Sequence, residues 1–186
     1  MNALEATLGR LAQRLSASGT PYMVIGGFAN LQWGRPRLTQ DLDVTIAADD
    51  EQLERLLAVL APAFRARVEA PMEFARSTAV VPLESAEGVR IDMVIARLAL
   101  EHEAIARART VRIMDIEVRF ATAEDLILHK IISERSRDLE DVEGIVRRQR
   151  GALDLEYLRP RIRQLSNALQ RPEMVTEFER LLGSPA

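Results

Sequence analysis

The sequence contains no cysteine, only two histidines and a single lysine. The absence of cysteine excludes disulfide scaffolds, zinc ribbons, iron–sulfur clusters and cysteine nucleophiles. Two histidines, His102 and His129, are too few for a histidine-rich metal site. The chain also lacks an apolar run long enough to span a membrane, and its amphipathic N-terminus does not resemble a signal peptide. We therefore expect a soluble, cytoplasmic protein that does not associate with membranes.

The composition is that of a globular chain. Of the 186 residues, 47% are apolar and 28% are charged with both signs mixed, which excludes wholesale disorder. This length predicts one domain, or one domain with a helical appendage. The net charge of −3 does not indicate a surface that coats nucleic acid, although it leaves room for a local basic patch.

The order of apolar patterns predicts an α/β (α+β) fold that ends in a C-terminal helical segment. The composition changes at residue 120, so we expect a core over 1–120 and a helical segment over 121–186. Expected strands are 22–25, 37–46, 63–68, 76–83 and 89–95, with a hairpin over 110–120 that turns near Met114 and Asp115. Expected helices are 3–18, 28–33, 51–61, 98–107, 123–134, 138–149, 154–168 and 172–182.

The most informative stretch runs from an apolar strand into Gly26-Gly27 and, thirteen residues later, into Asp41-Leu42-Asp43. Glycines before a helix allow a phosphate to approach the backbone N–H groups of the helix N-terminus closely. Side chains two apart on a strand share a face, so we expect Arg37, Thr39, Asp41 and Asp43 to project together.

A third carboxylate, Asp92, lies between Ile91 and Met93 in the middle of a predicted strand. Adjacent carboxylates repel each other, and a divalent cation with oxygen ligands relieves that repulsion. Asp41, Asp43 and Asp92 beside a phosphate cradle therefore predict a site for Mg²⁺ or Mn²⁺ and for in-line phosphoryl or nucleotidyl transfer.

This arrangement resembles the DNA polymerase beta-like nucleotidyltransferase superfamily, whose members combine Gly-Gly or Gly-Ser, a spacer of similar length, Asp-apolar-Asp and a third acid on a later strand. The finer pattern resembles the AbiEii-type nucleotidyltransferases of type IV toxin–antitoxin systems. It consists of Arg37 and Thr39 before the acids, then Lys130, and then an Arg137-Asp138 run that continues to Asp141. The resemblance covers residues 20–150 and implies a mixed β-sheet flanked by helices. It also implies that residues 121–186 contribute to the active-site cleft.

The resemblance implies a role for each residue. Asp41 and Asp43 would hold the metals, and Asp92 would complete one metal site and activate the acceptor hydroxyl. Gly26 and Gly27 would cradle the NTP phosphates with help from Thr39, while Lys130 and Arg37 would neutralise the triphosphate. The remaining matched residues would hold the phosphate-binding side chains in place without contacting the nucleotide themselves: Arg137, Asp138 and Asp141.

Simpler interpretations remain open for several of these residues. Arg37 could pair with Asp43, and Thr39 is better explained as structural than as catalytic. Lys130 could pair with Glu134 at i,i+4 on a helix surface. However, 24 of 25 basic residues are arginine, which suggests that the one lysine is needed as a compact ammonium. Asp138 could be stabilised by a helix dipole, and Asp141 could be solvated.

The sequence thus predicts transfer of NMP from an NTP to a hydroxyl of RNA, tRNA or protein, as in the toxin of a toxin–antitoxin pair with a cognate antitoxin partner. Two alternatives stay open. One is a small-molecule nucleotidyltransferase that modifies an antibiotic, and the other is a non-catalytic nucleotide-binding or antitoxin relative. The C-terminal arginines could form a solvated helix face or could contact an RNA backbone.

Overall fold

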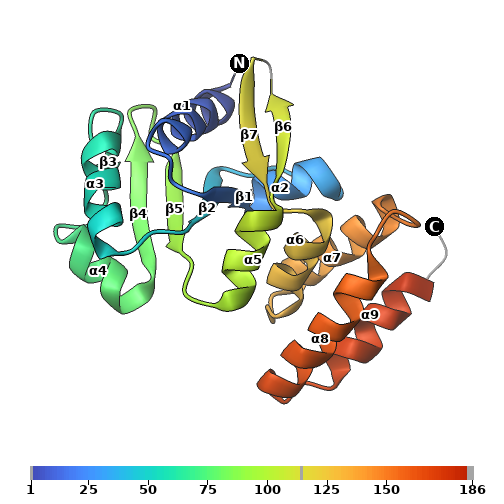
Figure 1. The fold of residues 1–186 in the computed structure, drawn as a ribbon. Coiled ribbons are helices and arrows are strands. Elements are labelled where there is room, and N and C mark those ends of the chain that lie inside the picture. The colour runs from blue at the N-terminus through green and yellow to red at the C-terminus, as the bar shows by residue number, and fades with distance from the viewer. Residues whose placement is uncertain (1, 114, 184–186) are drawn as a thin grey trace. The chain divides into compact units, whose positions relative to one another are not determined.

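The computed structural model describes residues 2–113 and 115–183, which form two units (Figure 1). The sheet unit comprises Met1–Phe28 and Leu38–Ala121, and the helical unit comprises Ala29–Arg37 and Thr122–Ala186. The helical unit therefore contains a segment, residues 29–37, that belongs by sequence to the N-terminal part of the chain.

In the described part of the sheet unit, seven strands form one sheet in the order β3-β4-β5-β2-β1-β7-β6. The β2–β5 and β1–β7 pairs are parallel and the remaining pairs are antiparallel, which confirms the predicted mixed sheet. The strands are β1 (Tyr22–Ile25), β2 (Asp41–Ile46), β3 (Phe64–Ala66), β4 (Val80–Ser85), β5 (Arg90–Ile95), β6 (Arg109–Ile113) and β7 (Ile116–Phe120).

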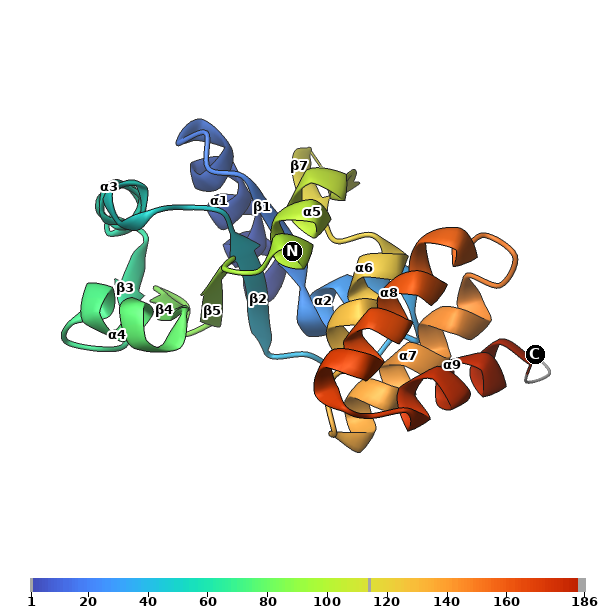
Figure 2. The same ribbon diagram turned by 60° about the horizontal axis from the view of Figure 1, so that its bottom comes forward.

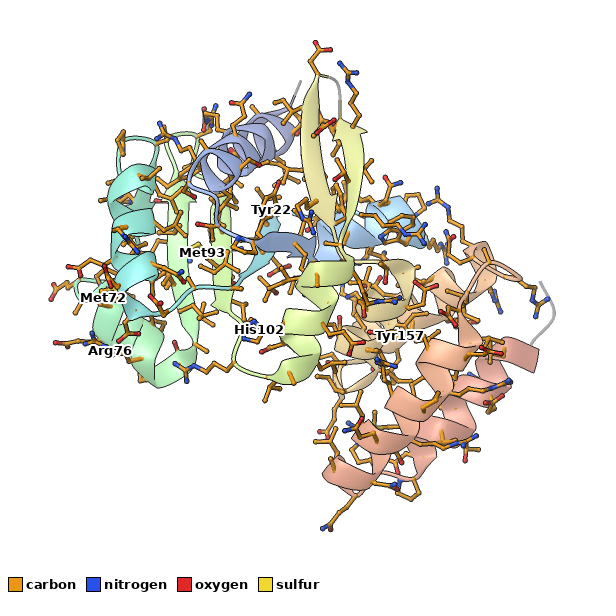
Figure 3. All side chains as sticks on the ribbon, viewed as in Figure 1. Tyr22, Met72, Arg76, Met93, His102 and Tyr157 are labelled. Carbon is orange, nitrogen blue, oxygen red and sulfur yellow. The ribbon has the colours of Figure 1, made fainter. Side chains whose placement is uncertain are left out.

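Helices cover both faces of this sheet. The helices of the sheet unit are α1 (Ala3–Ala17), α3 (Asp50–Leu60), α4 (Pro71–Thr78) and α5 (Ala99–Arg107). Helix α1 packs against β7 and β2, and α5 packs on the opposite face in a cluster with Met23 and Ala121. The buried spacing of Leu8, Leu11 and Leu15 on α1 is the helical period that the sequence predicted. Tyr22 and Met93 lie in the interior of this unit (Figure 3).

The helical unit consists of α6 (Ala123–Ile131), α7 (Ser136–Arg148), α8 (Leu155–Leu169) and α9 (Glu173–Gly183), together with the end of α2 (Gly26–Trp33). Helix α6 packs on α7 and α8, and α9 packs on the same two helices (Figure 2). Tyr157 is labelled in Figure 3. Its buried phenol on α8 donates to Asp125 of α6 at 2.6 Å. No helix of the described residues is long and apolar enough to cross a membrane.

Two of the predicted strands were partly wrong. Residues 71–78 form α4, because Pro71 is preorganised for the first turn of a helix, and the chain becomes extended only after Ala79 at φ 60°. The strand expected over 37–46 begins only at Asp41, which pairs with Arg90, the first residue of β5. The residues before Asp41 lie beyond this ladder and form an irregular segment. The predicted hairpin is confirmed as β6–β7, while Met114 of its turn lies outside the described residues.

One hydroxyl in the core of the sheet unit is buried without a hydrogen-bond partner. Thr45 of β2 is fully buried, and its Oγ1 has no partner among the described residues. A buried hydroxyl that has lost its water without gaining a partner lowers the free energy of unfolding. Thr7 on α1 is equally buried, but its hydroxyl donates to the Ser85 hydroxyl at 3.2 Å.

We therefore predict opposite effects for two chemically identical substitutions. Thr45→Val should raise the free energy of unfolding by up to about 1 kcal/mol, because it removes an unsatisfied group. Thr7→Val should lower it by about 1 kcal/mol, because it removes the hydrogen bonds that the Thr7 hydroxyl makes with Ser85 and Arg10. Urea unfolding of both variants measures the difference, and a destabilised Thr45→Val variant would contradict the prediction.

Candidate active site

The glycine pair lies where β1 ends and α2 begins. Gly26 has φ +65°, a conformation that a residue with a side chain rarely adopts, and it turns the chain directly from the strand into the helix. A Cβ atom at this position would lie 1.8 Å from Oδ2 of Asp43. Residue 26 must therefore be glycine for two independent reasons, since the carboxylate of Asp43 occupies the space beside its Cα.

The three predicted aspartates lie together on one face of the sheet unit. Asp43 on β2 is in register with Asp92 on the parallel neighbour β5, so their side chains point to the same face. Asp41 lies two residues before Asp43 and shares that face. All three side chains are half-buried. The adjacency that the sequence suggested for Asp43 and Asp92 thus follows from the parallel pairing of their strands.

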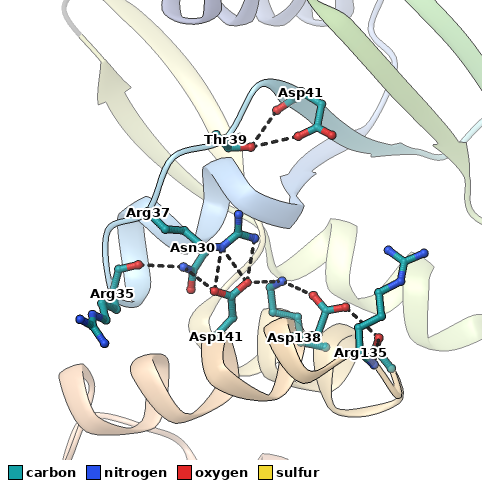
Figure 4. A network of polar contacts seen from close by, with 10 residues as sticks. Asn30, Arg35, Arg37, Thr39, Asp41, Arg135, Asp138 and Asp141 are labelled. Carbon is teal, nitrogen blue, oxygen red and sulfur yellow. Dashed lines mark hydrogen bonds and ion pairs between the residues drawn. The ribbon is translucent and has the colours of Figure 1, made fainter.

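Thr39 contacts one of these acids from the irregular segment that precedes β2. Its hydroxyl donates to Oδ1 of Asp41 at 3.0 Å (Figure 4). The expectation that Arg37 and Thr39 share a strand face with the acids is wrong, because both residues come before the strand. Thr39 instead orients Asp41 locally, which agrees with its interpretation as a structural residue.

The donor set of these aspartates fits a hard divalent cation in chemistry but not as a preformed cage. Carboxylate oxygens are the ligands that Mg²⁺ prefers. In the described residues, however, no three acidic or histidine side chains converge closely enough to hold a metal ion. Mg²⁺ usually binds through one or two carboxylates, several waters and substrate phosphates. The arrangement fits such substrate-dependent binding.

The helical unit contains a network of charged side chains centred on Asp141 of α7. Asp141 is 4% exposed and accepts from Arg37 through Nε at 2.9 Å and Nη2 at 2.9 Å (Figure 4). Its Oδ2 lies 2.7 Å from Nζ of Lys130, and its Oδ1 accepts from Nδ2 of Asn30 at 3.0 Å. The expected alternative, a solvated Asp141, is therefore wrong.

Lys130 is buried in this network. It is 5% exposed and bridges Asp141 and Asp138, with Nζ 2.8 Å from Oδ1 of Asp138. The alternative pairing with Glu134 on a helix surface is therefore replaced by pairing with two acids of α7. These two carboxylates take two of the three donors of the ammonium group. The hydroxyl of Ser133 donates a hydrogen bond to Oδ2 of Asp138 at 2.7 Å.

The charges of the network lower the pKa values of both aspartates. Burial by itself raises the pKa of Asp141, but hydrogen bonds from Arg37 and Lys130 outweigh that effect and lower it from 3.8. Burial likewise opposes a lowered pKa at Asp138, where hydrogen bonds from Lys130 and Ser133 prevail. Both aspartates thus remain ionised at neutral pH and hold their cations in place. Arg137, the other residue expected to support the site, is exposed at the start of α7.

Sequence reasoning missed Asn30, which lies on α2. Its side chain is fully buried and connects the chain before β2 to α7. The available signal was a polar residue in the otherwise apolar start of a helix, Gly26-Gly27-Phe28-Ala29. That pattern alone does not say which group the amide meets, because Asp141 is 111 positions away in the chain.

A cavity of about 820 Å³ lies in the helical unit between residues 34–37 and one face of α7. This volume suits a small-molecule ligand. The Arg37–Asp141 pair forms part of its wall. Four arginines and three carboxylates line the cavity, so its lining carries a net positive charge: Arg35, Arg37, Arg147, Arg148, Glu140, Asp141 and Glu143.

Most C-terminal arginines contact other parts of the helical unit. Arg159 pairs with Glu179, and Arg147 pairs with Glu143. Arg148 donates to the carbonyl of Gly34, and the guanidinium of Arg161 lies 3.6 Å from the ring centroid of Tyr157. Arg159 and Arg148 thus join separate elements, while Arg147 and Arg161 make contacts within their own helices. These contacts weaken the interpretation of the arginines as an exposed RNA-binding stripe.

The chain matches known proteins at the level of family and fold. Residues 4–178 match the family described as nucleotidyl transferase of unknown function (DUF2204). No curated protein sequence matches the chain significantly.

Solved structures agree on the fold. ANT(2")-Ia in complex with adenylyl-2"-tobramycin has a TM-score of 0.62 and 17% identity, covering 90% of this chain and 99% of that one. An antigenic nucleotidyltransferase-like protein from Paracoccidioides brasiliensis has a TM-score of 0.55 and 17% identity, covering 95% and 92%. The lincosamide antibiotic adenylyltransferase LnuA, bound to lincomycin, has a TM-score of 0.55 and 14% identity, covering 78% and 98%. At these identities the likeness establishes the fold alone.

The space beside Gly26 generates a stability prediction with an internal control. Gly26→Ala should lower the free energy of unfolding through left-handed strain of about 1–2 kcal/mol and through overlap with Asp43 of about 1–3 kcal/mol more. Gly19 has a similar φ of +68°, and a Cβ atom there would have no atom within 4 Å, so Gly19→Ala should show the strain alone. Chemical denaturation measures the free energy of unfolding of both variants, and equal losses in Gly26→Ala and Gly19→Ala would contradict the predicted overlap with Asp43.

The lowered pKa values of Asp138 and Asp141 predict how stability depends on pH. A carboxylate whose pKa is lower in the folded state contributes stability above its unfolded pKa, here near 3.8, and loses it as the pH falls through the folded value. The free energy of unfolding should therefore fall below about pH 4. Asp141→Asn should be less stable at pH 7 and should show a shallower fall in acid. Urea unfolding between pH 3 and 7 measures both, and an undiminished acid slope in this variant would contradict the prediction.

Proposed function

The chain belongs to a family of nucleotidyl transferases of unknown function, and we propose that it transfers a nucleoside monophosphate from an NTP to an acceptor hydroxyl. The observation that carries this proposal is the register of Asp43 and Asp92 on parallel strands, with the carboxylate of Asp43 against Gly26. A glycine turn at a helix start and adjacent carboxylates are the elements that phosphate binding and metal-assisted transfer require.

We assign metal binding to Asp41, Asp43 and Asp92. Mg²⁺ or Mn²⁺, when bound, would stabilise charge on the transferring phosphoryl group and on the leaving pyrophosphate. Asp92 would orient the acceptor hydroxyl and accept its proton. Thr39 would keep Asp41 oriented through its hydrogen bond.

We assign phosphate binding to Gly26 and Gly27 at the start of α2, and charge neutralisation to Lys130 and Arg37. Among the described residues Lys130 pairs with two carboxylates, so the third donor of its ammonium group supports a contact with a triphosphate. The supporting roles belong to Asp138 and Asp141, which hold these cations, and to Arg137 at the exposed start of α7.

For the acceptor we propose a hydroxyl of RNA, tRNA or protein, as in an AbiEii-type toxin with a cognate antitoxin. The motif from Arg37 to Asp141 supports this proposal, and so does the net positive lining of the cavity in the helical unit, which favours an anionic acceptor.

A second candidate function is the modification of a small-molecule antibiotic. The fold similarity to ANT(2")-Ia and to LnuA supports it. The four arginines and three carboxylates of the cavity leave a small net positive charge, which disfavours a strongly cationic drug. Incubation with each labelled NTP and with total RNA, protein extract, an aminoglycoside or a lincosamide distinguishes the two candidates by the molecule that becomes labelled.

We predict that NTP binding depends on a divalent metal and on Asp43. Titration calorimetry of wild type should show tighter NTP binding with Mg²⁺ than without it. Asp43→Asn should abolish that difference and should lower transfer at least about a hundredfold, equivalent to ~2.7 kcal/mol of transition-state stabilisation, while the fold remains intact. Glu84→Gln, which removes another carboxylate of the same sheet, is the control and should behave as wild type. Equally strong NTP binding with and without metal would sink the proposal.

A further inference from the structure

Asn30 has a fixed orientation in the helical unit. Its side-chain nitrogen donates to the carbonyl oxygen of Arg35 at 2.9 Å and to Oδ1 of Asp141 at 3.0 Å. Both neighbours only accept hydrogen bonds, so the amide cannot be rotated by 180° without facing oxygen with oxygen. Position 30 therefore requires an amide side chain. Aspartate has the same shape but would place a second buried carboxylate against Asp141.

Close packing reinforces this orientation. The Oδ1 atom of Asn30 would lie 2.2 Å from a Cβ atom on Gly34, so glycine at that position is what leaves room for the amide. On the other side, a Cβ atom on Gly144 of α7 would lie 3.1 Å from the backbone nitrogen of Arg35. Two glycines thus let residues 34 and 35 approach both the amide of Asn30 and helix α7.

Asn30 also determines how Asp141 can share its oxygens. Oδ1 of Asp141 accepts hydrogen bonds from Nδ2 of Asn30 and Nε of Arg37. Its Oδ2 accepts from Nη2 of Arg37 and lies beside Nζ of Lys130. With the amide in place, the carboxylate plane is fixed from both sides, and Arg37 meets it in a bidentate fork. Without the amide, Oδ1 loses its one neutral donor, and the carboxylate can turn toward Lys130.

We propose that Asn30 is a positioning residue for the nucleotide: it orients Asp141, which in turn fixes Arg37 and Lys130 for the triphosphate. This inference rests on the proposed function, which assigns these two cations to the NTP. Asn30 does not contact the substrate in this scheme. It acts through the orientation of a buried carboxylate.

The competing explanation is that Asn30 merely fastens residues 30–37 to α7. Gln149 provides a matched control, because its Nε2 donates to the carbonyl of Trp33 at 2.9 Å and so fastens the same segment to the end of α7. That contact does not involve Asp141. A purely structural role predicts the same consequences for the loss of either amide.

The experiment compares Asn30→Ala, Asn30→Ser, Gln149→Ala, Arg37→Ala and the Asn30→Ala/Arg37→Ala double variant. NTP affinity with Mg²⁺, KM for NTP, kcat and melting temperature are measured for each. We expect Asn30→Ala to weaken NTP binding and to raise KM by about tenfold, as for loss of one hydrogen bond to a charged group, with a smaller change in kcat. Asn30→Ser keeps a smaller hydrogen-bond donor, so its NTP affinity and KM should lie between those of wild type and Asn30→Ala. It replaces the alanine variant in the comparison if that variant does not fold.

Gln149→Ala should lower the melting temperature without changing NTP affinity. In the Arg37→Ala background, the Asn30→Ala effect on affinity should shrink, because the two residues act through one contact. Equal losses of affinity in Asn30→Ala and Gln149→Ala, wild-type affinity in both Asn30 variants, or fully additive effects with Arg37→Ala would each overturn the inference. Failure of the wild type to bind NTP in a metal-dependent manner would instead refute the proposed function.

Discussion

Several segments of the helical unit meet at the buried carboxylate of Asp141. A charge removed from water is tolerated only where other charges and hydrogen bonds replace the lost hydration. Asp141 receives that replacement from three places in the chain: the end of α2 through Asn30, the segment before β2 through Arg37, and α6 through Lys130. These three segments, which secondary-structure propensity alone would not bring together, thereby contact the same carboxylate. Together with the hydrogen bonds from Arg148 and Gln149 to the carbonyls of Gly34 and Trp33, this interaction links residues 29–37 to the C-terminal helices, with which they form one unit.

The sheet unit follows a different constraint, in which a backbone and a carboxylate compete for the same space. The position of Asp43 leaves no volume for a side chain at residue 26, and the turn requires a positive φ there. The glycine thus satisfies the conformation of the turn and the packing of an acid at once. This coupling gives a physical reason why Gly26 and Asp43 occur together in the sequence.

Features that depend on nearby residues could be predicted from the sequence. The strand before Gly26 and the helix of Leu8, Leu11 and Leu15 follow from local apolar spacing, and both are confirmed. The mixed sheet, which the family resemblance implied, is confirmed as well. The start of β2 could not be predicted, because it depends on where the partner strand β5 begins.

The candidate site divides in the same way. The spacing of Gly26, Asp41 and Asp43 suggested their chemistry, and the assignment of these residues to a nucleotide stays a prediction. Sequence periodicity could not predict the partners of Lys130 or the role of Asn30, because these contacts join residues on different helices and loops. A sequence pattern indicates that a buried polar residue needs a partner, but only the tertiary structure identifies it.

The near-absence of lysine gives the protein a built-in chemical reporter. Lys130 carries the one side-chain amine in the sequence, and it is 5% exposed between two carboxylates. An acylating reagent must reach this amine to react with it, so its burial slows the reaction. The rate at which such a reagent modifies this amine therefore reports how often the Asp141 network opens, and it does so without any engineered label.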